Sequence, residues 1–92
     1  MEKTIWKYSL EIRGTQTLEI PEGAEILTVQ VQDGIAFLWV LVDPDEQKEK
    51  RYFEVFETGE LIIYEMGLGR NYIGTFQLFS GNLVCHVFEK GV

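Results

Sequence analysis

The most distinctive pattern in the chain is an unbroken apolar run bounded by two turn signals. Residues 35–42 read Ile-Ala-Phe-Leu-Trp-Val-Leu-Val, after Asp33-Gly34 and before Asp43-Pro44. A strand that is buried on one side alternates apolar and polar residues, because successive side chains point to opposite faces. This run is apolar on both faces, so a second sheet, another subunit or a bound ligand must help to cover them.

Shorter alternating or apolar segments predict the other strands, and none of them has helical periodicity of useful length. The expected strands cover residues 4–12, 17–20, 25–32, 35–42, 51–57, 61–64, 72–79 and 83–89. Residues 45–51 form a polar, solvated loop, and one short helical turn fits within 44–50 or 64–70. About eight short strands predict an all-β fold, a single antiparallel β-sandwich or small barrel that spans residues 1–92.

The strongest turn signal is Asp33-Gly34, because both residues tolerate the positive φ that a type I′ hairpin requires. The pairs that a two-residue loop sets on the expected core side are Val31 with Ala36, Val29 with Leu38 and Leu27 with Val40. The pairs on the other side are Gln32 with Ile35, Gln30 with Phe37 and Thr28 with Trp39. That second side is mixed, with aromatic rings beside amides and a hydroxyl.

The last hairpin repeats this arrangement at an offset of 47 residues. Thr28, Gln30, Gly34, Trp39 and Val40 fall on Thr75, Gln77, Gly81, His86 and Val87. Duplication would explain the repeat, and so would two hairpins of equal geometry. In the matching register the mixed side pairs Gln77 with Val84 and Thr75 with His86, whereas Phe76, Leu78, Leu83 and Cys85 make the core-like side.

Two surfaces therefore combine rings with amides and hydroxyls. Such a combination supplies apolar area and a few orienting hydrogen bonds, as interfaces and ligand pockets do, and a core with satisfied polar groups has the same composition. Aromatic side chains more often build cores, but some could stack on a nucleobase: Trp6, Tyr8, Trp39, Tyr52, Phe56 and Tyr72. The candidate ligand-binding residues are Thr28, Gln30, Phe37, Trp39, Arg70, Thr75, Gln77 and His86.

Arg70 enters this set because it ends the glycine-rich stretch 67–70, where a guanidinium could bind a ligand phosphate bidentately. The stretch lacks the ending of a phosphate-binding loop and is a flexible loop in the first place. The sequence gives little support for catalysis. His86 is the single histidine; it could act as a base, but a lone histidine on a strand is more often a hydrogen-bonded structural residue. No spacing suggests a metal site, so we expect a non-enzymatic protein without metal or cofactor.

Composition narrows the range of partners and locations. The 92 residues carry a net charge of −7, which argues against binding to the backbone of duplex DNA. A single cysteine, Cys85, excludes an intrachain disulfide framework and is expected to be a buried apolar residue rather than a reactive thiol. No apolar stretch approaches the roughly 18 residues of a membrane span, and no signal peptide is evident, so we expect a cytosolic protein away from membranes.

Several stretches resemble a family of short uncharacterised proteins from phages and prophages. They are residues 3–8 (KTIWKY), 20–32 (IPEGAEILTVQVQ), 38–44 (LWVLVDP), 74–77 (GTFQ) and 86–89 (HVFE). The resemblance spans nearly the whole chain, is weakest over 45–70, and implies an origin in a phage or mobile element. It brings no activity and no functional residue with it.

These observations favour a homo-oligomeric binding protein of the host cytosol that counters host defence. The leading hypothesis is sequestration of a small cyclic nucleotide signal in a pocket of the oligomer. The alternatives are a protein that blocks a host defence or nucleic-acid enzyme, and a minor virion or assembly component.

Overall fold

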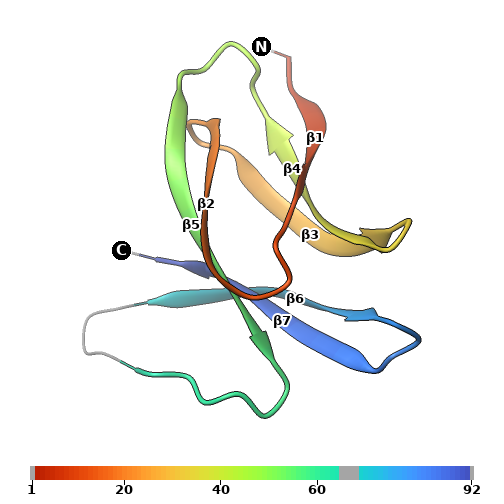
Figure 1. Ribbon diagram of the computed structural model, residues 1–92. Helices are drawn as coiled ribbons and strands as arrows, with labels where there is room; N and C mark the ends of the chain where they lie inside the picture. Colours follow the sequence, from red (N-terminus) through yellow and green to blue (C-terminus); the bar gives the residue numbers. More distant parts are fainter. Residues whose placement is uncertain (1, 65–68, 92) are drawn as a thin grey trace.

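The computed structural model describes residues 2–64 and 69–91, which form seven antiparallel strands in two sheets (Figure 1). The strands are β1 (Thr4–Ser9), β2 (Gly14–Pro21), β3 (Glu25–Gln32), β4 (Ile35–Val42), β5 (Lys48–Glu57), β6 (Arg70–Leu78) and β7 (Leu83–Lys90). Sheet A has the order β1-β4-β3, and sheet B has the order β2-β5-β7-β6. The predicted small antiparallel β-sandwich is therefore confirmed.

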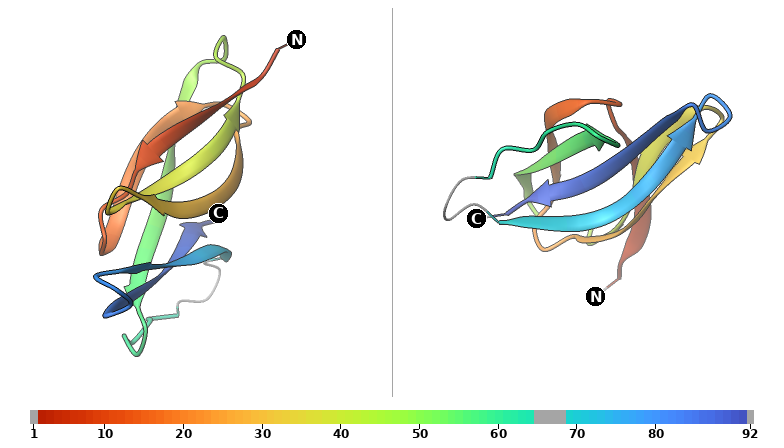
Figure 2. Two further views of the ribbon diagram at one scale, coloured as in Figure 1. Left: turned by 90° about the vertical axis from the view of Figure 1, so that its right-hand side faces the viewer. Right: turned by 90° about the horizontal axis from the view of Figure 1, so that it is seen from below.

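The chain passes between the sheets at residues 10–13, 22–24 and 43–47, so both sheets enclose one core. β5 runs from the end of the molecule that holds β2 to the end that holds the β6–β7 hairpin (Figure 2). On one side the edge strand β3 packs against the edge strand β6. That contact closes the sandwich where no ladder of hydrogen bonds joins the two sheets.

The apolar run of β4 divides into two halves, as its register predicts. Ala36, Leu38, Val40 and Val42 are at most 1% exposed and belong to the core. That core also contains Leu10, Ile20, Ala24, Val29, Phe53, Val55, Phe76, Leu78, Cys85 and Val87. The alternate residues point outward: Ile35 is 49% exposed, and Phe37, Trp39 and Leu41 are half-buried.

The hairpin registers are confirmed except at one position. Asp33 and Gly34 have φ angles of 52° and 77°, as a type I′ turn requires. The expected pairs hold from Gln32–Ile35 to Thr28–Trp39, but the pairing of Leu27 with Val40 is wrong. A β-bulge lies there, and Ile26 pairs with Val40 instead.

The second hairpin keeps the expected pairs Thr75–His86 and Gln77–Val84. Its connection covers residues 79–82, which is longer than the first turn, and Phe79, Ser80 and Gly81 have positive φ angles. β6 also contains a bulge, at Ile73 between Tyr72 and Gly74. The two hairpins therefore share their inner register but differ in turn length and in the position of the bulge.

The strand predicted at residues 61–64 is absent. β5 already pairs with β2 on one side and with β7 on the other, so the next segment has no free edge beside it. Residues 58–64 leave the sheet instead, and the guanidinium of Arg70 donates a hydrogen bond of 3.1 Å to the carbonyl of Ile63.

Several predicted strand boundaries also shift, and the predicted helical turn is not found at residues 44–50. β1 ends at Ser9 because Leu10 and Ile12 turn in to pack with the core, so the predicted strand 4–12 is too long. The first residues of β5 pair with the end of β2, so this strand begins at Lys48 within the predicted polar loop. Residues 44–50 contain a turn rather than a helix, and the alternative helical turn at 64–70 extends over residues outside the described ranges.

Gly74 lies where β6 approaches β3 most tightly, and a Cβ atom there would be 2.8 Å from Cγ1 of the buried Val29. Gly74→Ala should therefore destabilise the protein by roughly 1–3 kcal/mol, measured by urea unfolding. Gly69→Ala is the matched control, since its Cβ would meet nothing within 4 Å. The double variant Gly74→Ala/Val29→Ala should lose less stability than the losses of the two single variants added together. Equal stability of Gly74→Ala and the wild type would refute the close contact.

Candidate functional site

The outward side of sheet A gathers four of the predicted ligand-binding residues. We call this surface the aromatic face; it consists of Ile5, Lys7, Ser9, Glu25, Thr28, Gln30, Gln32, Ile35, Phe37, Trp39 and Leu41. The Lys7 ammonium lies 4.5 Å from the ring centroid of Phe37 and 5.6 Å from that of Trp39. It also donates a hydrogen bond of 2.7 Å to the side chain of Gln32. This surface therefore offers aromatic area with one cation.

The outward side of sheet B holds Thr75, Gln77 and His86, away from the first group. Both ring nitrogens of His86 have hydrogen-bond partners: Nδ1 is 2.9 Å from the Thr75 hydroxyl and Nε2 is 2.7 Å from the Thr58 hydroxyl. The Tyr72 hydroxyl continues this chain, at 2.5 Å from that of Thr75. Because each nitrogen already contacts a hydroxyl, a substrate proton would reach His86 only after one of these bonds opened.

Arg70 lies apart from both groups in a buried ion pair. Its Nε is 2.6 Å from Oε1 of Glu54, and the two side chains are only 9% and 7% exposed. The rings of Phe56 and Tyr64 lie over the guanidinium at 5.8 Å and 5.1 Å. A ligand phosphate would have to compete with the Glu54 carboxylate for this cation. Residues 67 and 68 of the glycine-rich stretch lie outside the described ranges.

The eight predicted residues thus occupy three places rather than one site. The internal repeat is the reason, because its two hairpins belong to different sheets and each turns its mixed side outward. Thr28, Gln30, Phe37 and Trp39 lie on sheet A, and Thr75, Gln77 and His86 lie on sheet B. Arg70 lies near them in sequence but is paired with Glu54.

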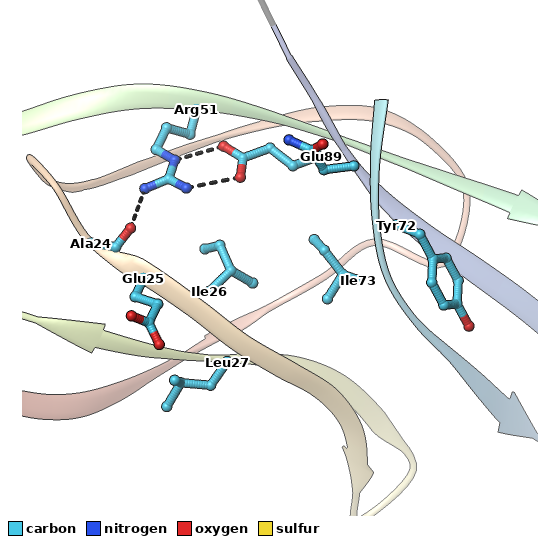
Figure 3. A pocket seen from close by; sticks show the side chains of 9 residues that line it. Ala24, Glu25, Ile26, Leu27, Arg51, Tyr72, Ile73 and Glu89 are labelled. Carbon is cyan, nitrogen blue, oxygen red and sulfur yellow. Dashed lines mark hydrogen bonds and ion pairs between the residues drawn. The ribbon is translucent and has the colours of Figure 1, made fainter. Parts of the chain in front are cut away.

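A hollow between β3 and β6 brings together residues that the sequence patterns do not connect (Figure 3). Its volume is about 460 Å³, and it is lined by Ala24, Glu25, Ile26, Leu27, Arg51, Asn71, Tyr72, Ile73 and Glu89. Both bulged residues, Leu27 and Ile73, line it. Bulges turn strands locally and often occur beside functional sites. Here they lie where the two edge strands enclose the hollow.

One end of the hollow is fixed by Arg51 and Glu89, which form a bidentate ion pair (Figure 3). The two N–O distances are 2.6 Å and 2.8 Å, and a further nitrogen of Arg51 donates to the carbonyl of Ala24 at 2.6 Å. The hydrogen bond to Glu89 raises the pKa of Arg51 above its ordinary value. Arg51 thereby links sheet B to the start of β3 and holds this end of the hollow in shape.

A second hollow of about 440 Å³ adjoins the first and shares Arg51, Asn71 and Glu89 with it. Its remaining lining residues are Glu49, Lys50, Tyr52, Lys90 and Gly91. We call the two hollows together the β3–β6 groove. Its charged residues balance, with Lys50, Arg51 and Lys90 against Glu25, Glu49 and Glu89, in a chain whose net charge is −7. Tyr52 and Tyr72 also line the groove and are exposed, but the Tyr72 ring packs against Phe88 and points away from the hollow (Figure 3).

Sequence reasoning included Tyr52 and Tyr72 among six possible stacking residues but missed the groove itself. Its residues come from β3, β5, β6 and β7, and the bulges that help to position them interrupt the alternation from which register is read. The one local signal of the groove was the cluster of bases from Lys48 to Arg51, but such a cluster is equally typical of a solvated loop.

The protein is thus a small β-sandwich with the β3–β6 groove between the edge strands of its two sheets. The chain belongs to the family described as Domain of unknown function (DUF7352), which matches residues 1–92. No curated protein and no solved structure matches the chain. Over the ranges that the structure describes, no helix is long and apolar enough to cross a membrane.

Cys85 is fully buried, and its thiol donates to the carbonyl of Ile12 at 3.7 Å. Burial raises the pKa of this thiol, and the negative charges of Glu57 and Glu60 add to the shift. A folded thiol that resists ionisation is a poor nucleophile. Cys85 therefore matches the expected buried apolar residue.

The raised pKa of Cys85 predicts a pH dependence of stability. Above about pH 8.5 the thiol ionises first in the unfolded chain, so the free energy of unfolding should fall as the pH rises towards the folded pKa. Urea unfolding between about pH 8 and pH 9.5 measures this slope, and Cys85→Ser, although less stable throughout, should lack this contribution. Equal slopes in the two proteins would contradict the raised pKa.

Proposed function

We propose that the protein is a non-enzymatic binding protein that takes up a small nucleotide in the β3–β6 groove. The observation that carries the proposal is the local charge of this groove. Three bases and three acids line it, so the groove is neutral in a chain whose net charge is −7, and the exposed Tyr52 adds an aromatic ring. A ligand with both a flat ring and an anionic group fits that combination.

Each part of a nucleotide has a matching part of the groove. Ile26 and Ile73 offer apolar contact to a base, and the amide of Asn71 can exchange hydrogen bonds with a base edge. The Tyr72 ring packs against Phe88 on the outer side of sheet B and only borders this part of the groove. Phosphate suits Lys50 and Lys90, because Arg51 is already engaged by Glu89. The two volumes fall within the range of about 300–1,000 Å³ that is typical of ligand pockets.

Binding without turnover agrees with the state of the nucleophiles and bases. His86 is held between two threonine hydroxyls, and Cys85 is fully buried. Among the residues that the structure describes, no group of three or more His, Cys, Asp or Glu side chains could hold a metal ion. A phage origin, which the resemblance implies, belongs to the proposal. In that setting the protein would sequester a cyclic nucleotide signal of the host defence in the cytosol.

Isothermal titration with cyclic di- and trinucleotides and ADP-ribose derivatives tests this function. We expect saturable binding of at least one compound. Lys50→Glu/Lys90→Glu should weaken it at least about tenfold, because two phosphate contacts become repulsive. Lys3→Glu/Lys48→Glu is the control, since it makes the same change of charge at bases outside the groove lining. Absence of heat with every compound, for a folded protein, would remove the nucleotide proposal.

A second candidate function is blockade of a host protein, and the segment 61–64 favours it. Leu61 is 92% exposed and Ile63 is 76% exposed, so this segment presents apolar side chains outside the sheet. Exposed apolar groups of this kind mark protein contact sites.

Capture of one stoichiometric partner from host lysate would support the second function if Leu61→Lys/Ile63→Lys abolished it. Each replaced side chain loses roughly 1.5–3 kcal/mol of burial, so a loss of capture is expected for a contact centred on this segment. Thr15→Lys/Thr17→Lys, on exposed positions of β2, is the control and should leave the capture intact. Capture that survives the Leu61→Lys/Ile63→Lys change would place the contact elsewhere.

A further inference from the structure

The aromatic face is the least charged large surface of the described strands. A quarter of the residues in the chain are charged, yet this face carries one base, Lys7, and one acid, Glu25. Its apolar residues include Ile5 and Ile35, which are 56% and 49% exposed. The other side of the same sheet is already buried in the core. The face therefore has the composition of an interface: apolar and aromatic, with few charges.

We infer that a second copy of this chain docks on the aromatic face, with the two sheets A packed face to face about a two-fold axis parallel to β4. This contact shares only Glu25 with the β3–β6 groove and does not rest on the proposed nucleotide function. An interface between identical chains must be self-complementary. The following features meet that condition.

The first feature is the placement of the two charges. Lys7 lies on β1 and Glu25 lies on β3, on opposite sides of the central strand β4. A two-fold axis along β4 sets β1 of one copy over β3 of the other, so Lys7 approaches the partner's Glu25 twice in the dimer. Lys7 is level with Trp39 and Glu25 is level with Leu41, an offset of about 7 Å along the strand. In the single chain the Lys7 ammonium lies over Phe37 and bonds to Gln32, on the side away from Glu25. Its flexible side chain must turn towards Leu41 to span this offset in the dimer.

The second feature is net charge. Each copy carries −7, so most surfaces of two copies repel each other. The aromatic face is neutral, because Lys7 and Glu25 cancel. It is therefore a surface on which two copies can meet without desolvating like charges.

The third feature is size. Three strands of up to eight residues give a footprint about 14 Å wide and about 27 Å long. Because the side chains protrude, the accessible surface of the face is larger than this flat footprint and approaches the roughly 800 Å² per partner of a standard interface. Aligned sheets pack about 10 Å apart, a spacing that the outward rings of Phe37 and Trp39 can fill.

The molar mass of the full chain, measured by light scattering and sedimentation from about 1 μM to about 1 mM, tests this inference. The wild type should be a dimer in the upper part of this range. Ile5→Lys/Ile35→Lys should raise the dissociation constant at least about tenfold, and these exposed positions leave the core intact. Leu61→Lys, at a more exposed site outside the face, should leave the dimer unchanged.

A charge exchange makes the test specific for the two-fold arrangement. Lys7→Glu and Glu25→Lys should each weaken the dimer, whereas the double variant Lys7→Glu/Glu25→Lys should recover most of the loss. A monomer at every concentration would overturn the inference. So would a dimer that is indifferent to Ile5→Lys/Ile35→Lys, or a double variant no better than the weaker single one.

Discussion

The contact between β3 and β6 is the constraint on which the rest of the structure depends. These edge strands belong to different sheets and touch without a ladder of hydrogen bonds. Their close approach requires Gly74, because a Cβ atom would collide with Val29. The adjacent bulges and the Arg51–Glu89 pair leave a groove at the same seam. One seam thus closes the core and shapes the candidate ligand site.

Charge is distributed in a way that the net value of −7 conceals. Arg51 and Arg70 each hold a glutamate in a bidentate pair, one at the groove and one against the outer side of sheet B. Both pairs link segments that are distant in sequence, so these two guanidinium groups are engaged in holding the fold together. The bases beside the groove that are available to an anionic ligand are therefore Lys50 and Lys90.

The sequence was sufficient for the fold class and for most of the hairpin register, because Asp33-Gly34 sets the pairing of its two strands. It failed at Leu27, where an inserted residue changes the pairing without changing the apolar character of the strand. It also failed at residues 61–64, whose β propensity is high but whose neighbours in the sheet are taken. The groove was not predictable from local patterns, because four strands contribute to it.

The two-sidedness of β4 has a consequence for how this chain can change over time. The inward side chains must fit a packed interior; they are Ala36, Leu38, Val40 and Val42. The outward side chains are constrained by contacts on the outer face of sheet A; they are Ile35, Phe37, Trp39 and Leu41. Selection on the two sets is therefore separable, residue by residue, along a single strand. Substitution among descendants of this chain should have a period of two across β4. Substitutions at the outward positions would follow changes in what contacts this face, while the inward positions would stay apolar as long as the fold is kept.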